Sequence, residues 1–228
     1  MTPDYGRAFG LWRGACAPDW DAYVRHPFVA GLGDGTLPRA AFLRYLAQDY
    51  VFLIHFARAW ALAAVKSETL DEMRAASATV EALVTHEMAL HVRICAEAGL
   101  HDLEATVEAP QNLAYTRYVL EAGYSGDLLD LLAALAPCVL GYGEIGARLR
   151  AEGPAAPYRD WVETYGGPDY QQLCRDVGAL IDGAIARRLG AAPERLPRWT
   201  GLQGRFATAA RLEAGFWDMG LAPAQGLA

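Results

Sequence analysis

The sequence has almost no lysine, and its net charge is negative. Lys66 is the single lysine among 20 basic residues, and the 27 acidic residues bring the formal net charge to −7 over 228 residues. Nucleic-acid grooves and anionic membrane surfaces both reward clustered cations. The charge balance therefore argues against either kind of partner.

Long uncharged runs and a leader segment are also missing. The apolar runs are interrupted by Asp49, Arg58, Lys66 or Glu144 before they reach the roughly 18 uncharged residues of a membrane span. Residues 1–10 contain no apolar h-region, so no secretory signal is visible. The four cysteines include no Cys-x-x-Cys pair, which favours reduced thiols over disulfides or a zinc site. We expect a cytoplasmic protein.

The chain has no alternating apolar and polar runs of the kind that form half-buried strands, no low-complexity linker and no internal repeat. The chain is instead rich in apolar residues. Residues of the AVILMFWYC set make up 53% of the chain, and 43 residues are alanine, which occupies a helix interior at the lowest free-energy cost. We expect an all-α fold that forms a single domain over residues 1–228.

Apolar residues at three- and four-residue spacing predict three long helices. These are 38–66, which opens with a proline in its first turn, 69–98, which ends at Gly99, and 127–150. Shorter helices are predicted at 4–16, 18–26, 111–122, 157–165, 168–189 and 198–218. Gly33-Asp34-Gly35 predicts a turn. A bundle of long helices suits an internal cavity lined by facing side chains.

Asp49 lies among apolar residues in the first long helix, where an unpaired buried carboxylate costs several kcal/mol. One interpretation is a structural ion pair with Arg58 or with an arginine on a neighbouring helix. The other is ligand binding. Phe52 and Phe56 follow on the same helical face, and an acid beside aromatic rings suits a flat nitrogen heterocycle.

Cys138 follows Pro137, which should kink the helix and free a carbonyl. A lone cysteine in a helical core is usually an inert small hydrophobe. Tyr142, one turn later, presents a hydroxyl beside the thiol and favours a nucleophile, whose activating group must come from elsewhere because no histidine is near in sequence. Glu144 points to a different face, and we expect it to be a structural partner or cap for another segment.

Glu213 precedes Phe216 by three residues and Trp217 by four. A carboxylate against aromatic rings tends to have a raised proton affinity, which suits acid–base work near neutral pH. The alternative is an exposed glutamate with the aromatic rings on the opposite side. Tyr115 and Tyr165 are interpreted either as core tyrosines or as donors of hydrogen bonds to a substrate.

Glu87 and His91 stand four residues apart, a spacing that could bind a metal, with Glu81 and His86 close by. A carboxylate-bridged di-iron site needs matching ligands from further helices, yet 168–189 contains no histidine. We therefore expect no metal, and we expect these groups to form hydrogen bonds between helices.

Five segments of the chain occur in a characteristic order: HPFVAGLGDGTLPRAAFLRYLAQDYVFLIHFARAWALAAVK, ALVTHEMALH, LAALAPCVLGYGEIGARL, YRDWVETYGG and EAGFWDM. Together they resemble the TenA/THI-4 family of thiaminase II or aminopyrimidine aminohydrolase proteins over nearly the whole chain. Cys138 after a proline matches the cysteine-bearing branch. The resemblance implies a haem-oxygenase-like all-α fold without haem or other cofactor, a homotetramer, and a role in thiamin salvage.

Residue by residue, the resemblance implies Cys138 as nucleophile, Asp49 as the acid that binds the aminopyrimidine edge and Glu213 as the acid/base. The pocket residues that it implies are Phe52, Tyr115, Tyr142 and Tyr165. Several members carry tyrosine where this chain has Phe52, so one hydroxyl near the leaving group is absent. The expected reaction converts 4-amino-5-aminomethyl-2-methylpyrimidine to the 5-hydroxymethyl pyrimidine and ammonia. Thiamin and its formylamino derivatives remain open as substrates.

Two alternatives belong to other classes of protein. The first is a helical di-iron oxidase of the same architecture, against which the missing second histidine cluster counts. The second is a non-catalytic regulator that binds pyrimidines in the same pocket, against which the joint presence of Cys138, Asp49 and Glu213 counts.

Overall fold

The computed structural model describes residues 3–222, and within that range every regular element is a helix. The α-helices are α1 (Arg7–Ala15), α2 (Ala17–Val24), α3 (Pro27–Asp34), α4 (Arg39–Lys66), α5 (Leu70–Ala82), α6 (Met88–Glu97), α7 (Pro110–Ser125), α8 (Leu128–Glu152), α9 (Arg159–Gly166), α10 (Pro168–Leu189) and α11 (Pro197–Leu221). A π-helical turn η1 (Leu83–Glu87) and the 3₁₀ turns η2 (Ala156–Tyr158) and η3 (Pro193–Arg195) complete the order. The expected all-α fold is confirmed.

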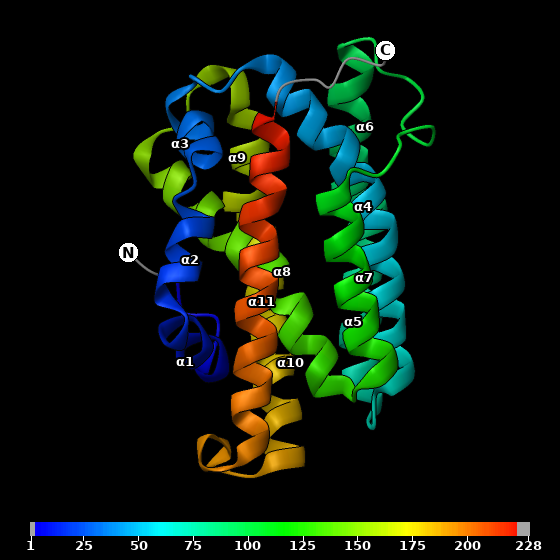
Figure 1. Ribbon diagram of the computed structural model, residues 1–228, viewed down its shortest axis with the longest axis vertical. Coiled ribbons are helices and arrows are strands. Elements are labelled where there is room, and N and C mark those ends of the chain that lie inside the picture. Colours follow the sequence, from blue (N-terminus) through cyan, green and yellow to red (C-terminus); the bar gives the residue numbers. More distant parts are fainter. Residues whose placement is uncertain (1–2, 223–228) are drawn as a thin grey trace.

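The helices form an elongated bundle around α8 and α11 (Figure 1). In the view of Figure 1, α11 runs along the middle, α1 to α3 lie on one side of it, and α4, α5 and α7 lie on the other. Helix α8 passes behind α11 and packs most extensively against α11 and α9, and also against α10 and α7. This arrangement points side chains from α4, α8 and α11 toward a shared interior.

Helix α8 is apolar because it is the central helix of the bundle. By length and composition it is the one helix of the described range that could cross a membrane, but 94% of its most apolar stretch is buried inside the protein. Its first turn is closed by a capping box between Asp127 and Asp130. The helix continues through Pro137, whose carbonyl accepts a hydrogen bond from the Tyr23 hydroxyl of α2 at 3.3 Å.

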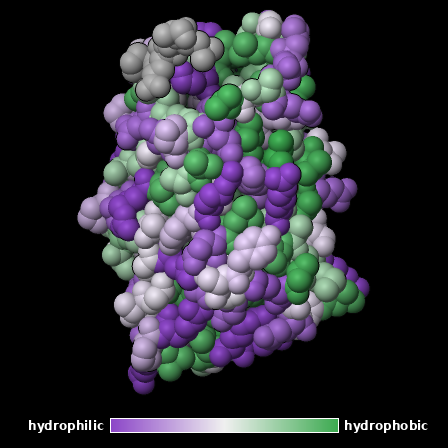
Figure 2. Space-filling model, turned by 45° about the vertical axis from the view of Figure 1, so that its right-hand side comes forward, coloured by the Kyte–Doolittle hydropathy of each residue, from purple (hydrophilic) through white to green (hydrophobic). Residues whose placement is uncertain are grey.

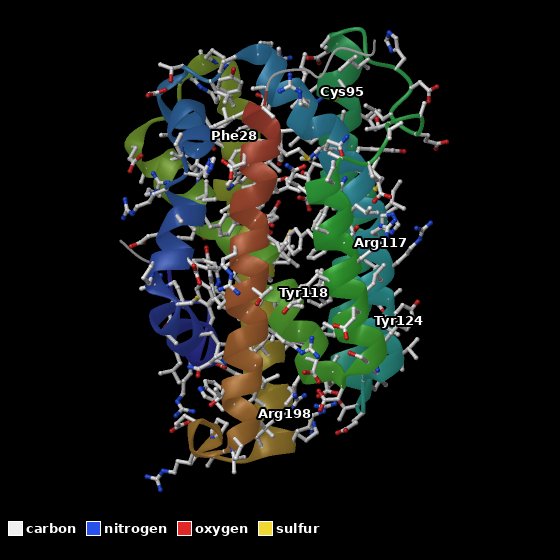
Figure 3. All side chains as sticks on the ribbon, in the orientation of Figure 1. Phe28, Cys95, Arg117, Tyr118, Tyr124 and Arg198 are labelled. Carbon is white, nitrogen blue, oxygen red and sulfur yellow. The ribbon has the colours of Figure 1, made fainter. Side chains whose placement is uncertain are left out.

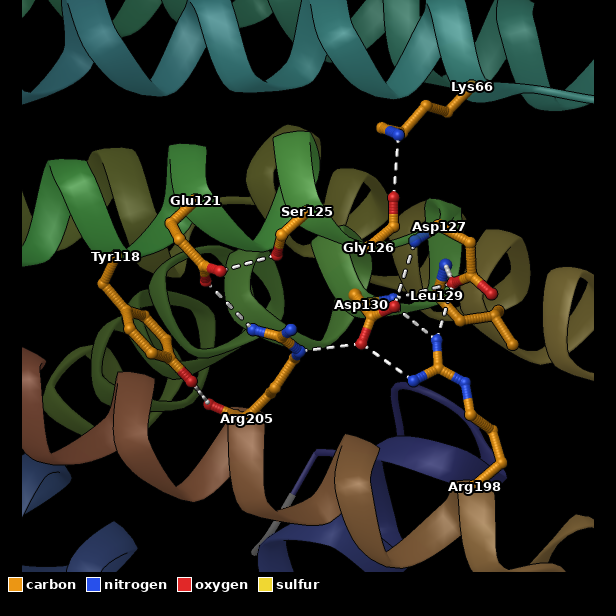
Figure 4. A network of polar contacts seen from close by, with 10 residues as sticks. All are labelled: Lys66, Tyr118, Glu121, Ser125, Gly126, Asp127, Leu129, Asp130, Arg198 and Arg205. Atoms are coloured by element: carbon orange, nitrogen blue, oxygen red, sulfur yellow. Dashed lines mark hydrogen bonds and ion pairs between the residues drawn. The ribbon is translucent and has the colours of Figure 1, made fainter.

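An ion-pair network fixes the axial position of α8 against α11 (Figure 4). Asp130 accepts from Arg205 Nε at 2.7 Å and from Arg198 of the same helix at 2.9 Å. Burial raises the pKa of Asp130, but the hydrogen bonds from Arg198 and from the Asp127 backbone outweigh it and lower the pKa to about 2. Cys138 follows Asp130 by eight residues, and Glu213 follows Arg205 by the same eight. The network therefore sets the register that brings Cys138 opposite Glu213.

Helix α3 was not expected from the spacing of apolar residues. His26 caps it by accepting a hydrogen bond from the Phe28 backbone N–H at 3.2 Å, and Gly35 ends it at φ 80°. Its two glycines make it a weak helix former, so packing must stabilise it. Phe28, labelled in Figure 3 beside α3 and α11, stacks on Trp217 of α11 at 4.8 Å between ring centroids. The expected turn therefore begins only at Gly35.

The predicted helix 69–98 is wrong in its middle, where the π-helical turn Leu83–Glu87 separates α5 from α6. A π turn inserts an extra residue and rotates the following helix face. Glu87, the last residue of the turn, and His91 beyond it are buried, whereas Glu81 and His86 are exposed. Apolar spacing alone does not reveal such an insertion.

Candidate functional site

The three residues expected to carry chemistry meet in the interior of the bundle. Asp49 comes from α4, Cys138 from α8 and Glu213 from α11, and their exposed fractions are 2%, 6% and 2%. Each is polar and stands where a plain helical core would place an apolar side chain. Their burial requires specific partners, because an unpaired buried polar group is costly.

Asp49 is paired with a histidine and a tyrosine, so the interpretation as an ion pair with Arg58 or another arginine is wrong. Its Oδ2 accepts from the Tyr45 hydroxyl at 2.9 Å and lies 2.7 Å from His91 Nε2. Arg58 instead lies on the exposed side of α4, 3.3 Å from His55 Nδ1. Both contacts of Asp49 are made by its Oδ2, and within residues 3–222 no hydrogen bond to Asp49 Oδ1 is found.

Glu213 joins the cysteine to a tyrosine. The Tyr115 hydroxyl donates to Glu213 Oε1 at 2.8 Å, and Cys138 and Glu213 are close enough that each affects the pKa of the other. Burial raises the pKa of Glu213 to about 8 and raises the pKa of Cys138 well above its ordinary value, to which the neighbouring Glu213 charge adds. At neutral pH the site therefore holds a thiol beside a carboxyl group that titrates near neutrality.

Aromatic rings surround these polar groups. The Phe52 ring lies 4.9 Å from the Tyr115 ring and 5.2 Å from the Phe56 ring, between centroids. The Tyr142 ring lies 5.0 Å from Tyr165 and 5.3 Å from Trp217. The four expected pocket residues Phe52, Tyr115, Tyr142 and Tyr165 are all buried at this site. Flat walls of this kind favour a flat, weakly polar ligand.

Glu87 and His91 join the same cluster, and the sequence analysis did not assign them to it. His91 Nδ1 lies 2.8 Å from the Glu87 backbone oxygen, and the Tyr165 hydroxyl donates to Glu87 Oε1 at 2.7 Å. Burial, with the charge of Asp49, raises the pKa of Glu87 to about 7. The expected hydrogen bonds between helices are confirmed for these two residues. The apolar residues around segment 86–91 (HEMALH) were the sequence signal that its inner face is buried.

The expectations for Glu144 and for metal ligands can be compared with the structure. Glu144 accepts from Arg13 at 2.9 Å and from Trp20 Nε1 at 3.2 Å, which confirms it as a structural partner for α1 and α2. In the part of the chain that the structure describes, no group of three or more His, Cys, Asp or Glu side chains is arranged to hold a metal ion.

A surface cavity of about 630 Å³ opens between the π turn with α6 and the α9–α10 pair. Its walls include Glu87, His86, Glu163, Asp169 and Tyr170. Glu87 lines this cavity and also accepts the hydrogen bond from Tyr165 in the buried cluster. Cys138, Asp49 and Glu213 do not line the cavity.

Comparisons with known proteins show the family to which the chain belongs. The sequence profile of the TENA/THI-4/PQQC family matches residues 14–222. An aminopyrimidine aminohydrolase of Halalkalibacterium halodurans is 36% identical over 207 residues, which cover 89% of this chain and 90% of that protein. One of Helicobacter pylori is 30% identical over 205 residues, covering 88% and 92%. A crystal structure described as a TenA family transcription regulator from Silicibacter sp. is 63% identical with a TM-score of 0.94, covering 96% of this chain and 98% of that one.

Proposed function

Because the chain belongs to the TENA/THI-4/PQQC family, we propose that it is an aminopyrimidine aminohydrolase, or thiaminase II, of thiamin salvage. The proposed reaction is hydrolysis of 4-amino-5-aminomethyl-2-methylpyrimidine to the 5-hydroxymethyl pyrimidine and ammonia. The observation that carries the proposal is the burial of Cys138, Glu213 and Asp49 in one cluster, where both carboxyl groups are close enough to raise the pKa of the thiol.

Cys138 attacks the ring because direct displacement at the exocyclic methylene is slow while the ring is aromatic. The ionised Glu213 carboxylate takes the proton of the neighbouring thiol, and Sγ then forms a bond to ring C6. The electron pair of the broken C6–N1 double bond moves onto ring nitrogen N1. Burial raises the pKa of the Cys138 thiol well above its ordinary value, so the thiol gives up its proton to Glu213 only as Sγ bonds to the ring.

Glu213, now protonated, gives its proton to the departing amine while the 4-amino group pushes electrons toward C5. The carboxylate that results takes a proton from water, whose oxygen adds to the exocyclic methylene. The C6–Sγ bond then breaks, the ring regains its aromaticity, and Cys138 and Glu213 return to their starting states. The products are the hydroxymethyl pyrimidine and ammonia.

Asp49 holds the pyrimidine by its oxygen Oδ1, which accepts a hydrogen bond from the 4-amino group. The rings of Phe52 and Phe56 lie on the same face of α4 and offer a wall on which the heterocycle stacks. Tyr142 presents a hydroxyl group to the ring nitrogens. Tyr165, whose hydroxyl hydrogen goes to Glu87, offers its oxygen as an acceptor to the leaving amine, and together they keep the reacting atoms in position. Phe52 provides no hydroxyl, so the leaving group meets an apolar ring there.

The decisive experiment is an ammonia-release assay with the aminomethyl pyrimidine and thiamin side by side. We expect Cys138→Ser and Cys138→Ala to lose ammonia release, and Cys16→Ser, a buried cysteine between α1 and α2, to keep it. Wild-type turnover in either Cys138 variant contradicts covalent catalysis. A protein that binds the hydroxymethyl pyrimidine and releases no ammonia from either substrate would be the regulator, the description carried by the Silicibacter structure.

We also propose that the chain assembles as a homotetramer in the cytoplasm. Several large apolar side chains are exposed, namely Leu70, Met73, Val84, Val92, Leu100, Leu113 and Tyr124. Figure 2 shows apolar groups interspersed with polar ones on the side that comes forward from the right of Figure 1. Burying them against other subunits removes that surface from water. All four cysteines are buried and free, as suits a reducing compartment. Light scattering on the purified protein tests the assembly.

A further inference from the structure

His91 is buried with a hydrogen-bond acceptor at each ring nitrogen. Its Nδ1 lies 2.8 Å from the backbone oxygen of Glu87, and a carbonyl oxygen only accepts, so Nδ1 carries a hydrogen. Its Nε2 lies 2.7 Å from Asp49 Oδ2. If Asp49 is ionised, Nε2 carries a hydrogen as well, and the ring is an imidazolium.

A chain of donors shows that Asp49 Oδ2 is an acceptor. Trp161 Nε1 can only donate, and it lies 3.2 Å from the Tyr45 hydroxyl oxygen. The Tyr45 hydroxyl in turn donates to Asp49 Oδ2 at 2.9 Å. An oxygen that receives the Tyr45 hydrogen and faces His91 at 2.7 Å has the surroundings of a carboxylate, since these hydrogen bonds favour the charged form.

The charges that face His91 are carboxyl groups. Asp49 of α4 contacts it directly, and Glu87 of the π turn lies beside it, hydrogen-bonded to Tyr165 of α9. Glu213 of α11 lies in the same buried cluster and is coupled to Asp49. Within residues 3–222 no lysine or arginine hydrogen-bonds to any of these three carboxyl groups. Although burial by itself lowers the pKa of His91, the hydrogen bond and charge of Asp49, with the charge of Glu87, raise it above its ordinary value.

We propose that His91 is a positioning residue that remains doubly protonated at neutral pH, keeps Asp49 ionised and holds its Oδ1 edge toward the aminopyrimidine. The π-helical turn Leu83–Glu87 places the Glu87 backbone oxygen under Nδ1 and so fixes the ring. Asp49 then accepts from the 4-amino group as a full anion, a stronger hydrogen bond than a neutral carboxyl group would make. This role rests on the proposed function of the site.

The protonation of His91 is measurable without any substrate. Selective ¹⁵N labelling of histidine distinguishes an imidazolium, with both ring nitrogens protonated, from either neutral tautomer, and His91→Gln identifies the signals. We expect both nitrogens of His91 to be protonated at pH 7 in the wild-type protein. In Asp49→Asn the carboxylate is gone, so His91 should become neutral at that pH. A neutral His91 in the wild type at pH 7 overturns the proposal, whether or not the enzyme activity is found.

The functional arm compares His91→Gln with His86→Gln. Glutamine can still donate to Asp49 from Nε2 but carries no charge, and exposed His86 in the same π turn receives the same substitution as a control. A carboxylate that loses a neighbouring cation has its pKa raised by about 1 to 3 units. Affinity of His91→Gln for the hydroxymethyl pyrimidine, measured by calorimetry, should therefore fall by up to about tenfold at pH 6 and less at pH 8, because the variant lacks the cation that keeps Asp49 ionised at low pH.

The possible outcomes distinguish a failure of the positioning role of His91 from a failure of the proposed function. An equal loss of affinity at pH 6 and pH 8 in His91→Gln means a merely structural role and refutes the positioning role. Wild-type affinity at both pH values refutes it too, and His86→Gln should match the wild type throughout. If the wild-type protein neither binds nor hydrolyses aminopyrimidines, the proposed function fails, and the ¹⁵N measurement still decides the state of His91.

Discussion

Replacing Glu213 by glutamine should stabilise the fold while it abolishes catalysis. Glu213 is 2% exposed, and burial raises its pKa from 4.5 to about 8. Between these two values the folded protein keeps a proton that the unfolded chain releases. Stability from this group is therefore greatest below pH 4.5 and declines as the pH rises toward 8. Glutamine has no proton to take up and still accepts the hydrogen bond from Tyr115.

The size of the effect follows from the two pKa values. One pKa unit corresponds to about 1.4 kcal/mol, so the carboxyl group costs about 1 kcal/mol at pH 5 and about 3 kcal/mol at pH 7 relative to strongly acidic solution. The stability difference between Glu213→Gln and wild type should accordingly grow by about 2 kcal/mol from pH 5 to pH 7. For a chain of this length that is a change of roughly 4 to 8 °C in the unfolding midpoint.

The assay is urea unfolding at fixed protein concentration and several pH values, since self-association would make the midpoint depend on concentration. Taking the difference between two pH values cancels any fixed effect of the substitution on packing. Glu81→Gln, a glutamate exposed on α5, removes the same charge and should show a constant difference from wild type. The reasoning is refuted if Glu213→Gln also differs from wild type by the same amount at pH 5 and pH 7.

Three further outcomes are expected. Asp130→Asn leaves Arg198 and Arg205 without their carboxylate. It should lower the free energy of unfolding, measured in urea, by about 2 kcal/mol, and it should reduce ammonia release because the α8–α11 register loosens. An unchanged unfolding midpoint contradicts the register argument. Asp49→Asn should weaken binding of the hydroxymethyl pyrimidine about tenfold or more by calorimetry, and unchanged affinity would remove its assigned role. The kcat/KM for ammonia release should rise with pH as Glu213 ionises, with a midpoint near its pKa of about 8; a profile that is already flat at pH 6 would exclude Glu213 as the base that activates Cys138.

Local pattern was enough to locate most helices. The predicted helix 168–189 coincides with α10, and 38–66 differs from α4 by one residue at its start. Apolar periodicity and end signals such as Pro168 act within a few residues, so they can be read without knowing the neighbours. Helix α3 and the π turn were not predicted. Helix α3 depends on packing against α11, and the π turn depends on an inserted residue.

Composition and order of motifs by themselves determined that this is an all-α protein with polar groups at Asp49, Cys138 and Glu213 on otherwise apolar faces. Only the tertiary structure decided which partners those groups have. Glu213 reaches Cys138 from 75 residues away, and His91 takes the place expected for an arginine beside Asp49. A buried charge must find its partner wherever the packing of helices places one, and that packing depends on long-range contacts which no local spacing encodes.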